Sequence, residues 1–234
     1  MTYVISDLHG TYRKYLQLLE LIGFGDEDTL YVVGDICDRG EESAEIYLDV
    51  MGRENVFCAK GNHELFLERN LPAVFPCLED IADPETVAEG NIASWNKNGG
   101  AKTIKSLFGR KSETICDIYR FVRDMPNYIQ ITVGGKRFTL VHAGVPEDMG
   151  NRLSECNAFD LLWVRPDYDA VFGDREMDVL IVGHTPTPLL TENREAKIYR
   201  GKGNIINIDC GAVFSYAGGR LGCLCLETME EYYV

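Results

Sequence analysis

The sequence predicts an α/β fold built around a largely parallel sheet. Over the first seventy residues, strand-like and helix-like segments alternate in the order β-α-β-α-β-α. This order is typical of parallel strands joined by right-handed crossovers. A second group of strands follows residue 127 and begins with a β-hairpin pattern. Polar residues, among them every histidine, come directly after these strands, so we expect a functional site at their carboxyl ends.

The N-terminal elements are defined by the spacing of their apolar residues. Three short apolar runs are typical of strands, and each is followed by a segment with helical apolar spacing. The strands are residues 3–5, 30–33 and 56–59, and the helices are residues 12–22, a segment containing 46–51, and a segment from about 62 to 72. Gly23 and Gly52 suit helix C-termini, and Pro72 would end the third helix.

The middle of the chain has a different character. Residues 73–127 are polar and mostly helical, with loop signals at Asp83-Pro84 and Asn98-Gly99-Gly100. We interpret them as a helical insertion in a single domain that spans residues 1–234. Beyond it, a Gly134-Gly135 turn between two strand-like segments predicts a hairpin. The remaining predicted strands are residues 128–133, 136–141, 179–182, 205–208 and 221–226.

The composition excludes several classes of protein. No apolar run approaches the ~18 residues that cross a bilayer, and the first residues lack the features of a signal peptide. We therefore expect a cytoplasmic protein with no membrane partner. The eight cysteines form no C-x-x-C pair and are expected to be reduced core residues. A net charge of −14 argues against nucleic-acid binding, which needs a basic surface. It does not exclude a phosphorylated substrate, because bound divalent cations invert the field locally.

The polar residues after the strands predict a metal site. The chain has four histidines, and each lies just past a strand, next to a glycine or one residue from it. A single histidine there is more often a hydrogen-bonded structural residue, but four in equivalent places are not explained in that way. Imidazole, carboxylate and carboxamide groups without thiolates suit Mn, Fe or Zn. Asp7 and His9 are two residues apart, so in an extended segment they could chelate one ion.

Five motifs together identify a family resemblance. They are Asp-Leu-His-Gly at 7–10, Gly-Asp-x-x-Asp-Arg-Gly at 34–40, Gly-Asn-His-Glu at 61–64, His-Ala-Gly at 142–144 and Gly-His-Thr at 183–185. In order and spacing the chain closely resembles the calcineurin-like metallophosphoesterases. Within them it resembles the phosphoprotein phosphatase branch, especially the bacterial and phage lambda-type serine/threonine phosphatases. The resemblance runs from about Ser6 to Gly211 and includes the stretch Trp95-Asn-Lys-Asn-Gly-Gly100.

The resemblance implies a fold and a set of residue roles. The fold is two mixed β-sheets sandwiched between helices. Two divalent ions, most consistent with Mn²⁺ although Fe or Zn would fit, are implied, and Asp35 would bridge them. The implied ligands of one ion are Asp7, His9 and Asp35, and those of the other are Asp35, Asn62, His142 and His184. The implied phosphate-binding residues are Arg39, Asn62 and Arg165, and the implied catalytic pair is His63 as general acid with Asp38 orienting it.

The implied reaction is hydrolysis of phosphoserine or phosphothreonine in proteins. Two ions ~3.5–4 Å apart lower the pKa of a shared water, so a bridging hydroxide can attack phosphorus directly, without a phosphoenzyme. Arginine binds phosphate in a bidentate manner, and a general acid assists the departure of the alkoxide. The substrate is thus a phosphorylated protein or a small phosphoester. Activity on phosphotyrosine, the oligomeric state and the physiological substrate stay open at this point.

Two alternatives remain beside this prediction. A sister family hydrolyses dinucleoside tetraphosphates, but it typically has Ala-Arg-Gly in place of Asp38-Arg39-Gly40 and Asp in place of Glu64. It also has a longer segment between its last two histidine motifs than the one here from His142 to His184. The other alternative is a non-catalytic metal-binding regulator, yet no ligand or acid is missing here. One departure from the lambda-type pattern is Lys60, which replaces an arginine, so any phosphate contact there would be looser or absent.

Overall fold

A computed structural model describes residues 1–150 and 152–234. It contains two five-stranded sheets, with strand orders β10-β9-β1-β2-β3 and β4-β5-β6-β8-β7. The strands are β1 (Thr2–Ile5), β2 (Thr29–Val33), β3 (Val56–Ala59), β4 (Tyr128–Val133), β5 (Lys136–Val141), β6 (Asp178–Val182), β7 (Tyr199–Arg200), β8 (Ile205–Asn207), β9 (Gly222–Cys225) and β10 (Glu231–Tyr233). The predicted strands are thus all present, and the short edge strands β7 and β10 are additional.

Both sheets are mixed. Strands β1, β2 and β3 run parallel, as do β5, β6 and β8, while β9, β10, β4 and β7 each pair antiparallel with a neighbour. The expectation of one largely parallel sheet therefore holds only for the centre of each sheet. The two mixed sheets implied by the family resemblance are confirmed. The predicted hairpin joins β4 and β5 through Gly134 and Gly135, and both turn residues have positive φ.

The sheets pack face to face because their apolar residues alternate. Val4 of β1 faces the interior between the sheets, while its neighbours Tyr3 and Ile5 pack against the helices on the other side. In β6, Ile181 faces the interior and Leu180 faces the outer layer. This period of two is the side-chain alternation of a strand. The result is a layered core of helices, sheet, sheet, and an outer layer of loops with one helix.

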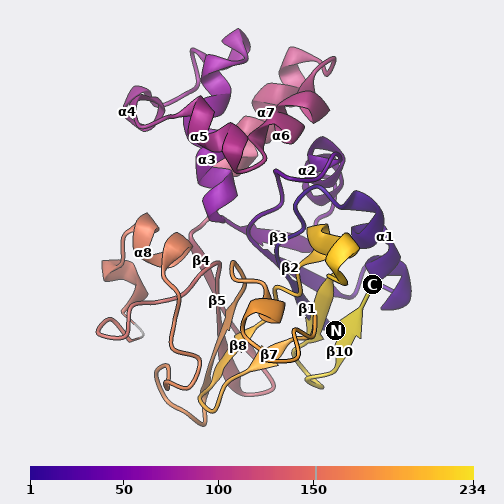
Figure 1. Cartoon of the computed structure of the whole chain (residues 1–234), viewed down its shortest axis with the longest axis vertical. Coiled ribbons are helices and arrows are strands. Elements are labelled where there is room, and N and C mark those ends of the chain that lie inside the picture. Colours follow the sequence, from indigo (N-terminus) through magenta and orange to yellow (C-terminus); the bar gives the residue numbers. More distant parts are fainter. Residues whose placement is uncertain (151) are drawn as a thin grey trace.

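The α-helices lie outside the space between the two sheets. They are α1 (Tyr12–Leu21), α2 (Ser43–Met51), α3 (Asn62–Asn70), α4 (Pro84–Ala88), α5 (Ile92–Lys97), α6 (Gly100–Leu107), α7 (Ser112–Asp124) and α8 (Ala158–Trp163). Of these, α1 and α2 pack against strands β10 and β3. Figure 1 shows α4 to α7 gathered beyond the end of α3, away from both sheets, and α8 beside β4 and β5. The chain between β3 and β4 is thus helical, and its status as an insertion in a single domain stays a prediction. No helix in the described ranges has both the length and the apolar character needed to cross a membrane.

Candidate active site

The polar residues that follow the strands lie together where the two sheets meet. They are Asp7 and His9 after β1, Asp35, Asp38 and Arg39 after β2, Asn62 and His63 after β3, His142 after β5, and His184 after β6. Contacts run between the sheets: Nε2 of His142 lies 2.8 Å from Oδ1 of Asn62, and the backbone N–H of His184 donates to Asp7 Oδ2 at 3.1 Å. The structure therefore gathers nine of the ten predicted site residues into one cluster.

The backbone at these positions is strained. Eight non-glycine residues in the described part of the chain have positive φ, and six of them are predicted site residues. The six are Asp7, His9, Asp35, Asp38, Arg39 and His184. Such a conformation costs energy for an L-residue and persists where the surrounding contacts enforce it. The turns after the strands thus hold these side chains at angles that a relaxed loop would not adopt.

Asp35 lies at the centre of the cluster. Its Oδ2 is 3.5 Å from Nε2 of His9 and 3.7 Å from Nε2 of His63, while its Oδ1 is 3.3 Å from Nε2 of His142. The Asp35 side chain is 2% exposed. Burial alone would raise its pKa, but the surrounding histidines, His142 foremost, outweigh burial and hold that pKa well below its usual value. The carboxylate is therefore charged and shared among ring nitrogens on both sides.

Backbone carbonyls fix the orientation of two of these rings. Nδ1 of His9 lies 2.8 Å from the carbonyl oxygen of Cys37, and Nδ1 of His142 lies 3.1 Å from that of Val33. A carbonyl oxygen only accepts, so each Nδ1 carries the proton. Each Nε2 is then directed towards Asp35, as in metal ligands whose second nitrogen is held by an outer partner.

Glu64 supports the turn that carries Asp35. Its fully buried carboxylate accepts the backbone N–H groups of Asp35 at 2.7 Å, Ile36 at 2.9 Å and Gly61 at 2.9 Å. The hydroxyl of Tyr47 donates to it at 3.0 Å. In the sequence, Glu64 served only to distinguish a phosphatase from a dinucleotide hydrolase. The structure gives Glu64 a wider role, because it joins the turn after β2 to the turn after β3.

His63 and Asp38 form a closely held pair. Nδ1 of His63 lies 2.6 Å from Oδ2 of Asp38, and both side chains are buried. On the other side of the ring, Nε2 of His63 lies 2.9 Å from Nη2 of Arg39, and Nη1 of Arg39 contacts Nε2 of His9. Arg39 therefore links the His63–Asp38 pair to the cluster around Asp35.

The cluster opens into a cleft of about 550 Å³. Arg39, Asn62, His63 and His184 form its polar floor, and Arg165 lines it as well, so all ten predicted site residues belong to the cluster or its cleft. The rest of its lining is largely apolar and was not predicted; the apolar members are Trp163, Pro186, Pro188, Leu189, Phe214 and Ala217. Such a cleft, with convergent polar groups at its base, has the form of a small-molecule or peptide site.

A comparison with protein families decides what this arrangement represents. The model of the calcineurin-like phosphoesterase family matches residues 2–208. The chain belongs to the calcineurin-like phosphoesterases. It is accordingly a metal-dependent phosphoester hydrolase, with the two-sheet fold of that family.

Individual relatives of this phosphoesterase carry different names. Serine/threonine-protein phosphatase 2 of Salmonella typhimurium is 25% identical over 191 residues, or 78% of each chain. The asymmetrical bis(5'-nucleosyl)-tetraphosphatase PrpE of Bacillus cereus is 24% identical over 266 residues, covering 99% of this chain and 92% of its own. A solved structure described as a putative diadenosine tetraphosphatase has a TM-score of 0.57 at 18% identity, covering 100% of this chain and 92% of the other. The likeness extends to both phosphatases and dinucleotide hydrolases.

The residues of this phosphoesterase fit a pair of cations. Two groups of possible ligand atoms each lie within 4.8 Å of one another: His9, Asp35 and His63, and Asp35, His142 and His184. Nε2 of His184 is buried without a hydrogen-bond partner.

The shifted pKa values in the cluster also favour the binding of cations. Burial, and then the charge of Asp209, raise the pKa of Asp7 well above its usual value. Burial would lower the pKa of His142, but the Asp35 carboxylate raises it to about 10. Buried carboxylates here thus attract positive charge, which divalent ions would supply.

The geometric groups, which contain only histidine and acidic side chains, differ from the predicted ligand sets in two members. The amide Asn62 is not among them, although its Oδ1 lies 2.8 Å from Nε2 of His142 and 3.0 Å from Nδ1 of His184. His63 stands with His9 and Asp35, where the sequence predicted Asp7. Asp7 lies next to Gly183. Residue 183 must lack a side chain, because a Cβ there would come within 2.1 Å of Asp7 Oδ2. The assignment of Asp7 as ligand and of His63 as acid stays a prediction.

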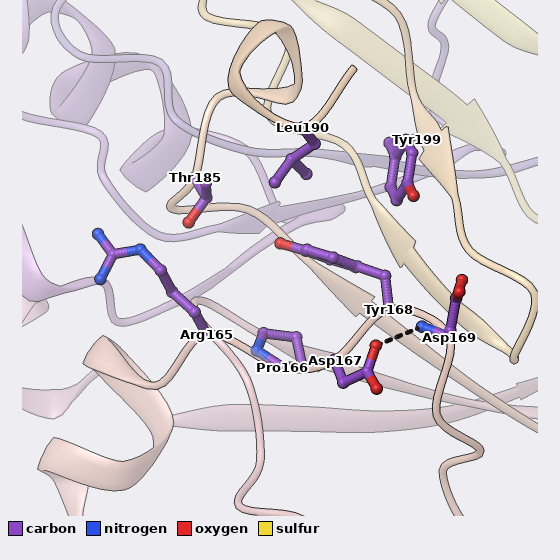
Figure 2. A pocket seen from close by; sticks show the side chains of 8 residues that line it. All are labelled: Arg165, Pro166, Asp167, Tyr168, Asp169, Thr185, Leu190 and Tyr199. Atoms are coloured by element: carbon purple, nitrogen blue, oxygen red, sulfur yellow. Dashed lines mark hydrogen bonds between the residues drawn. The ribbon is translucent and has the colours of Figure 1, made fainter. Parts of the chain in front are cut away.

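A second pocket adjoins the cleft. It has a volume of about 370 Å³ and shares Arg165 with the cleft, while its Thr185 follows His184 in the chain. Figure 2 shows Arg165 at one end, Asp167 and Asp169 at the other, and the Tyr168 ring between them. Asp169 is paired with Lys202 at 2.8 Å. The pocket is therefore aromatic and partly acidic, next to a phosphate-binding candidate.

Lys60 does not line the cleft. Its Nζ donates to Oε2 of Glu68 at 2.7 Å and to the carbonyl oxygen of Arg123 at 3.1 Å. Sequence reasoning missed Arg194, a loop residue that lines the cleft and itself has positive φ. No motif surrounds Arg194, so nothing in the local sequence pointed to it.

Proposed function

We propose that this phosphoesterase removes phosphate from phosphoserine and phosphothreonine in proteins. The observation that supports this most is the buried His63–Asp38 pair at the floor of the cleft. An alkoxide departs poorly unless it is protonated. In a dinucleoside tetraphosphate the leaving group is a nucleotide, which departs as a stable phosphate anion. A general acid held this firmly is needed for the first reaction and adds little to the second.

The chain's own groups carry the rest of the proposed mechanism. The guanidinium groups of Arg39 and Arg165 bind the phosphoryl oxygens and offset their negative charge. Asn62 would hold one ion and reach the phosphate. His63 gives the proton on Nε2 to the leaving oxygen while Asp38 holds Nδ1. The ligands would be Asp7, His9 and Asp35 on one side and Asp35, Asn62, His142 and His184 on the other. When bound, the ions, Mn²⁺ foremost with Fe or Zn as alternatives, supply a nucleophile at neutral pH. We place this reaction in the cytoplasm.

A second candidate is hydrolysis of dinucleoside tetraphosphates. Arg165 and Arg194 both line the cleft beyond Arg39, and extra guanidinium groups suit a chain of phosphates. Asp38 and Glu64 favour the protein phosphatase, because the dinucleotide hydrolases typically have alanine and aspartate there. A metal-binding regulator without activity is the third reading.

One experiment separates these functions. The purified protein with Mn²⁺ is assayed for kcat/KM on a phosphoserine peptide, p-nitrophenyl phosphate, ATP and diadenosine tetraphosphate under identical conditions. We expect kcat/KM to be higher for the phosphopeptide than for ATP or diadenosine tetraphosphate. We expect a chelator to stop all activity. A preference for diadenosine tetraphosphate would favour the second candidate. Metal-loaded protein that hydrolyses none of the four would overturn the enzyme assignment.

A further inference from the structure

The carboxylate of Asp38 is held by two side chains from the helical region between β3 and β4. Nε1 of Trp95, in α5, donates to Asp38 Oδ2 at 2.8 Å, and the hydroxyl of Thr103, in α6, donates to Asp38 Oδ1 at 2.6 Å. The backbone N–H of Asp38 donates back to the Thr103 hydroxyl at 2.8 Å. Trp95, Thr103 and Asp38 are each 0% exposed.

These contacts fix which atom of His63 carries a proton. An indole N–H can only donate, so Asp38 Oδ2 is an acceptor at that contact. Oδ2 therefore accepts the Nδ1–H of His63 as well, at 2.6 Å. Nε2 then points towards the cleft, where it accepts from Nη2 of Arg39 at 2.9 Å. To act as an acid, this nitrogen takes up a second proton while Arg39 turns to the phosphate.

The glycines of the same segment bring it close to Arg39. The backbone N–H of Arg39 donates to the carbonyl oxygen of Gly99 at 3.3 Å. Gly99 has φ +105°, and a Cβ there would lie 2.5 Å from the nitrogen of Arg39. A Cβ at Gly100 would lie 2.5 Å from the ring of Trp95. The Trp-Asn-Lys-Asn-Gly-Gly stretch thus packs against both the acid's partner and a phosphate-binding residue.

We propose that Trp95 and Thr103 are positioning residues for the reaction, acting through Asp38 on the ring of His63. This deepens the proposed function and rests on it. The helical region from α5 to α6 then belongs to the reaction machinery rather than forming only a wall of the cleft. A carboxylate with two fixed donors cannot rotate away from His63, so the imidazole stays in the orientation needed for proton transfer.

The kinetic test compares alkyl and aryl phosphates. Trp95→Phe keeps the ring but removes its donor, and Thr103→Val removes the hydroxyl with little change in shape. Each should lower kcat on a phosphoserine peptide by roughly tenfold or more, a part of the 10²–10⁴ that a placed acid contributes. The loss on p-nitrophenyl phosphate, whose leaving group needs no proton, should stay below about threefold, with KM unchanged. Equal losses on both substrates, or none on either, would overturn the proposal.

Tyr119→Phe is the matched control. Tyr119 lies in α7 of the same helical region, is 0% exposed, and donates to the carbonyl oxygen of Glu68 at 3.3 Å, with no contact to Asp38. It tests what the loss of one buried hydrogen bond does to the fold alone. Its alkyl-to-aryl ratio should equal that of the wild type, while melting temperatures show whether the three variants are comparably folded.

A second measurement is independent of activity. In a ¹H–¹⁵N spectrum of the imidazoles, the Nδ1–H signal of His63, assigned by its loss in His63→Gln, should lie at low field because of its short hydrogen bond. Trp95→Phe and Thr103→Val should shift it and Tyr119→Phe should not. If wild-type protein hydrolyses no phosphopeptide, the proposed function fails while this shift still supports the positioning. An unchanged signal in both variants would overturn the positioning itself.

Discussion

The two sides of the cleft differ in how their residues are held. On one side, the side chains of His63 and Asp38 are at most 1% exposed, and each polar atom of Asp38 has a partner within 2.8 Å. On the other side, Arg165 and Arg194 are exposed, and Leu189 is 74% exposed. We call these the closed side and the open side.

The difference separates two tasks. Proton transfer requires fixed geometry, and burial with full hydrogen bonding provides it. Recognition of varied substrates tolerates side chains that adjust, and exposed loops provide these. We therefore expect changes on the closed side to alter turnover and changes on the open side to alter the choice of substrate.

The largest effect should come from a residue common to both metal groups. Asp35→Asn removes the charge that faces His9, His63 and His142. A bound ion contributes several kcal/mol to catalysis, and ~1.4 kcal/mol is tenfold, so kcat/KM should fall by about 10³-fold or more on every substrate. Bound metal is measured by elemental analysis beside activity. A variant that keeps both metal and turnover would contradict the central role of Asp35.

A selective effect is expected from the closed side. His63→Ala should reduce turnover of phosphoserine peptides by roughly 10²-fold or more, because the alkoxide then leaves without a proton. Hydrolysis of p-nitrophenyl phosphate should suffer far less, since its phenolate is already a good leaving group. Parallel kinetics on the two substrates measure the difference. Similar losses on both would assign His63 to metal binding, as its place beside His9 and Asp35 allows.

The smallest effect is expected from the open side. Leu189→Ser should raise KM for phosphopeptides by about threefold, because part of one leucine's apolar contact is lost, and should leave kcat unchanged. Leu21→Ser, an exposed leucine at the end of α1 that does not line the cleft, is the matched control. A fall in kcat for Leu189→Ser, equal on peptides and p-nitrophenyl phosphate, would contradict the expectation that the open side affects only the choice of substrate.

The position of the site was predictable because strands impose it. Each predicted ligand follows a strand, and parallel strands end at the same edge, so the sequence placed His9 and Asp35 near each other. His142 follows a strand of the other sheet, and only the family resemblance implied that it joins them. The Trp95 and Thr103 contacts to Asp38 were not predictable, since they span 57 and 65 residues and depend on how the helices pack. In the sequence, Trp95 stood out only as the first residue of the stretch 95–100 that the family resemblance includes.

The strand pairing was predictable only in part. Strands β7 and β10 have two and three residues, too few to show an alternating pattern. Strand β9 was predicted, but nothing local in its sequence indicates that it pairs antiparallel with β1. Long-range pairing is decided by which edges remain open once the other strands are placed, and a local pattern carries no information on that.

This pairing also bears on when the enzyme becomes active during its synthesis. Strand β1 carries the turn with Asp7 and His9, and it is bordered on one side by β9. Thr2 hydrogen-bonds to Glu227, 225 residues further along the chain. A growing chain on the ribosome therefore cannot complete the sheet beneath the first two predicted ligands until β9 has emerged. We expect nascent chains that end before β9 to lack hydrolytic activity.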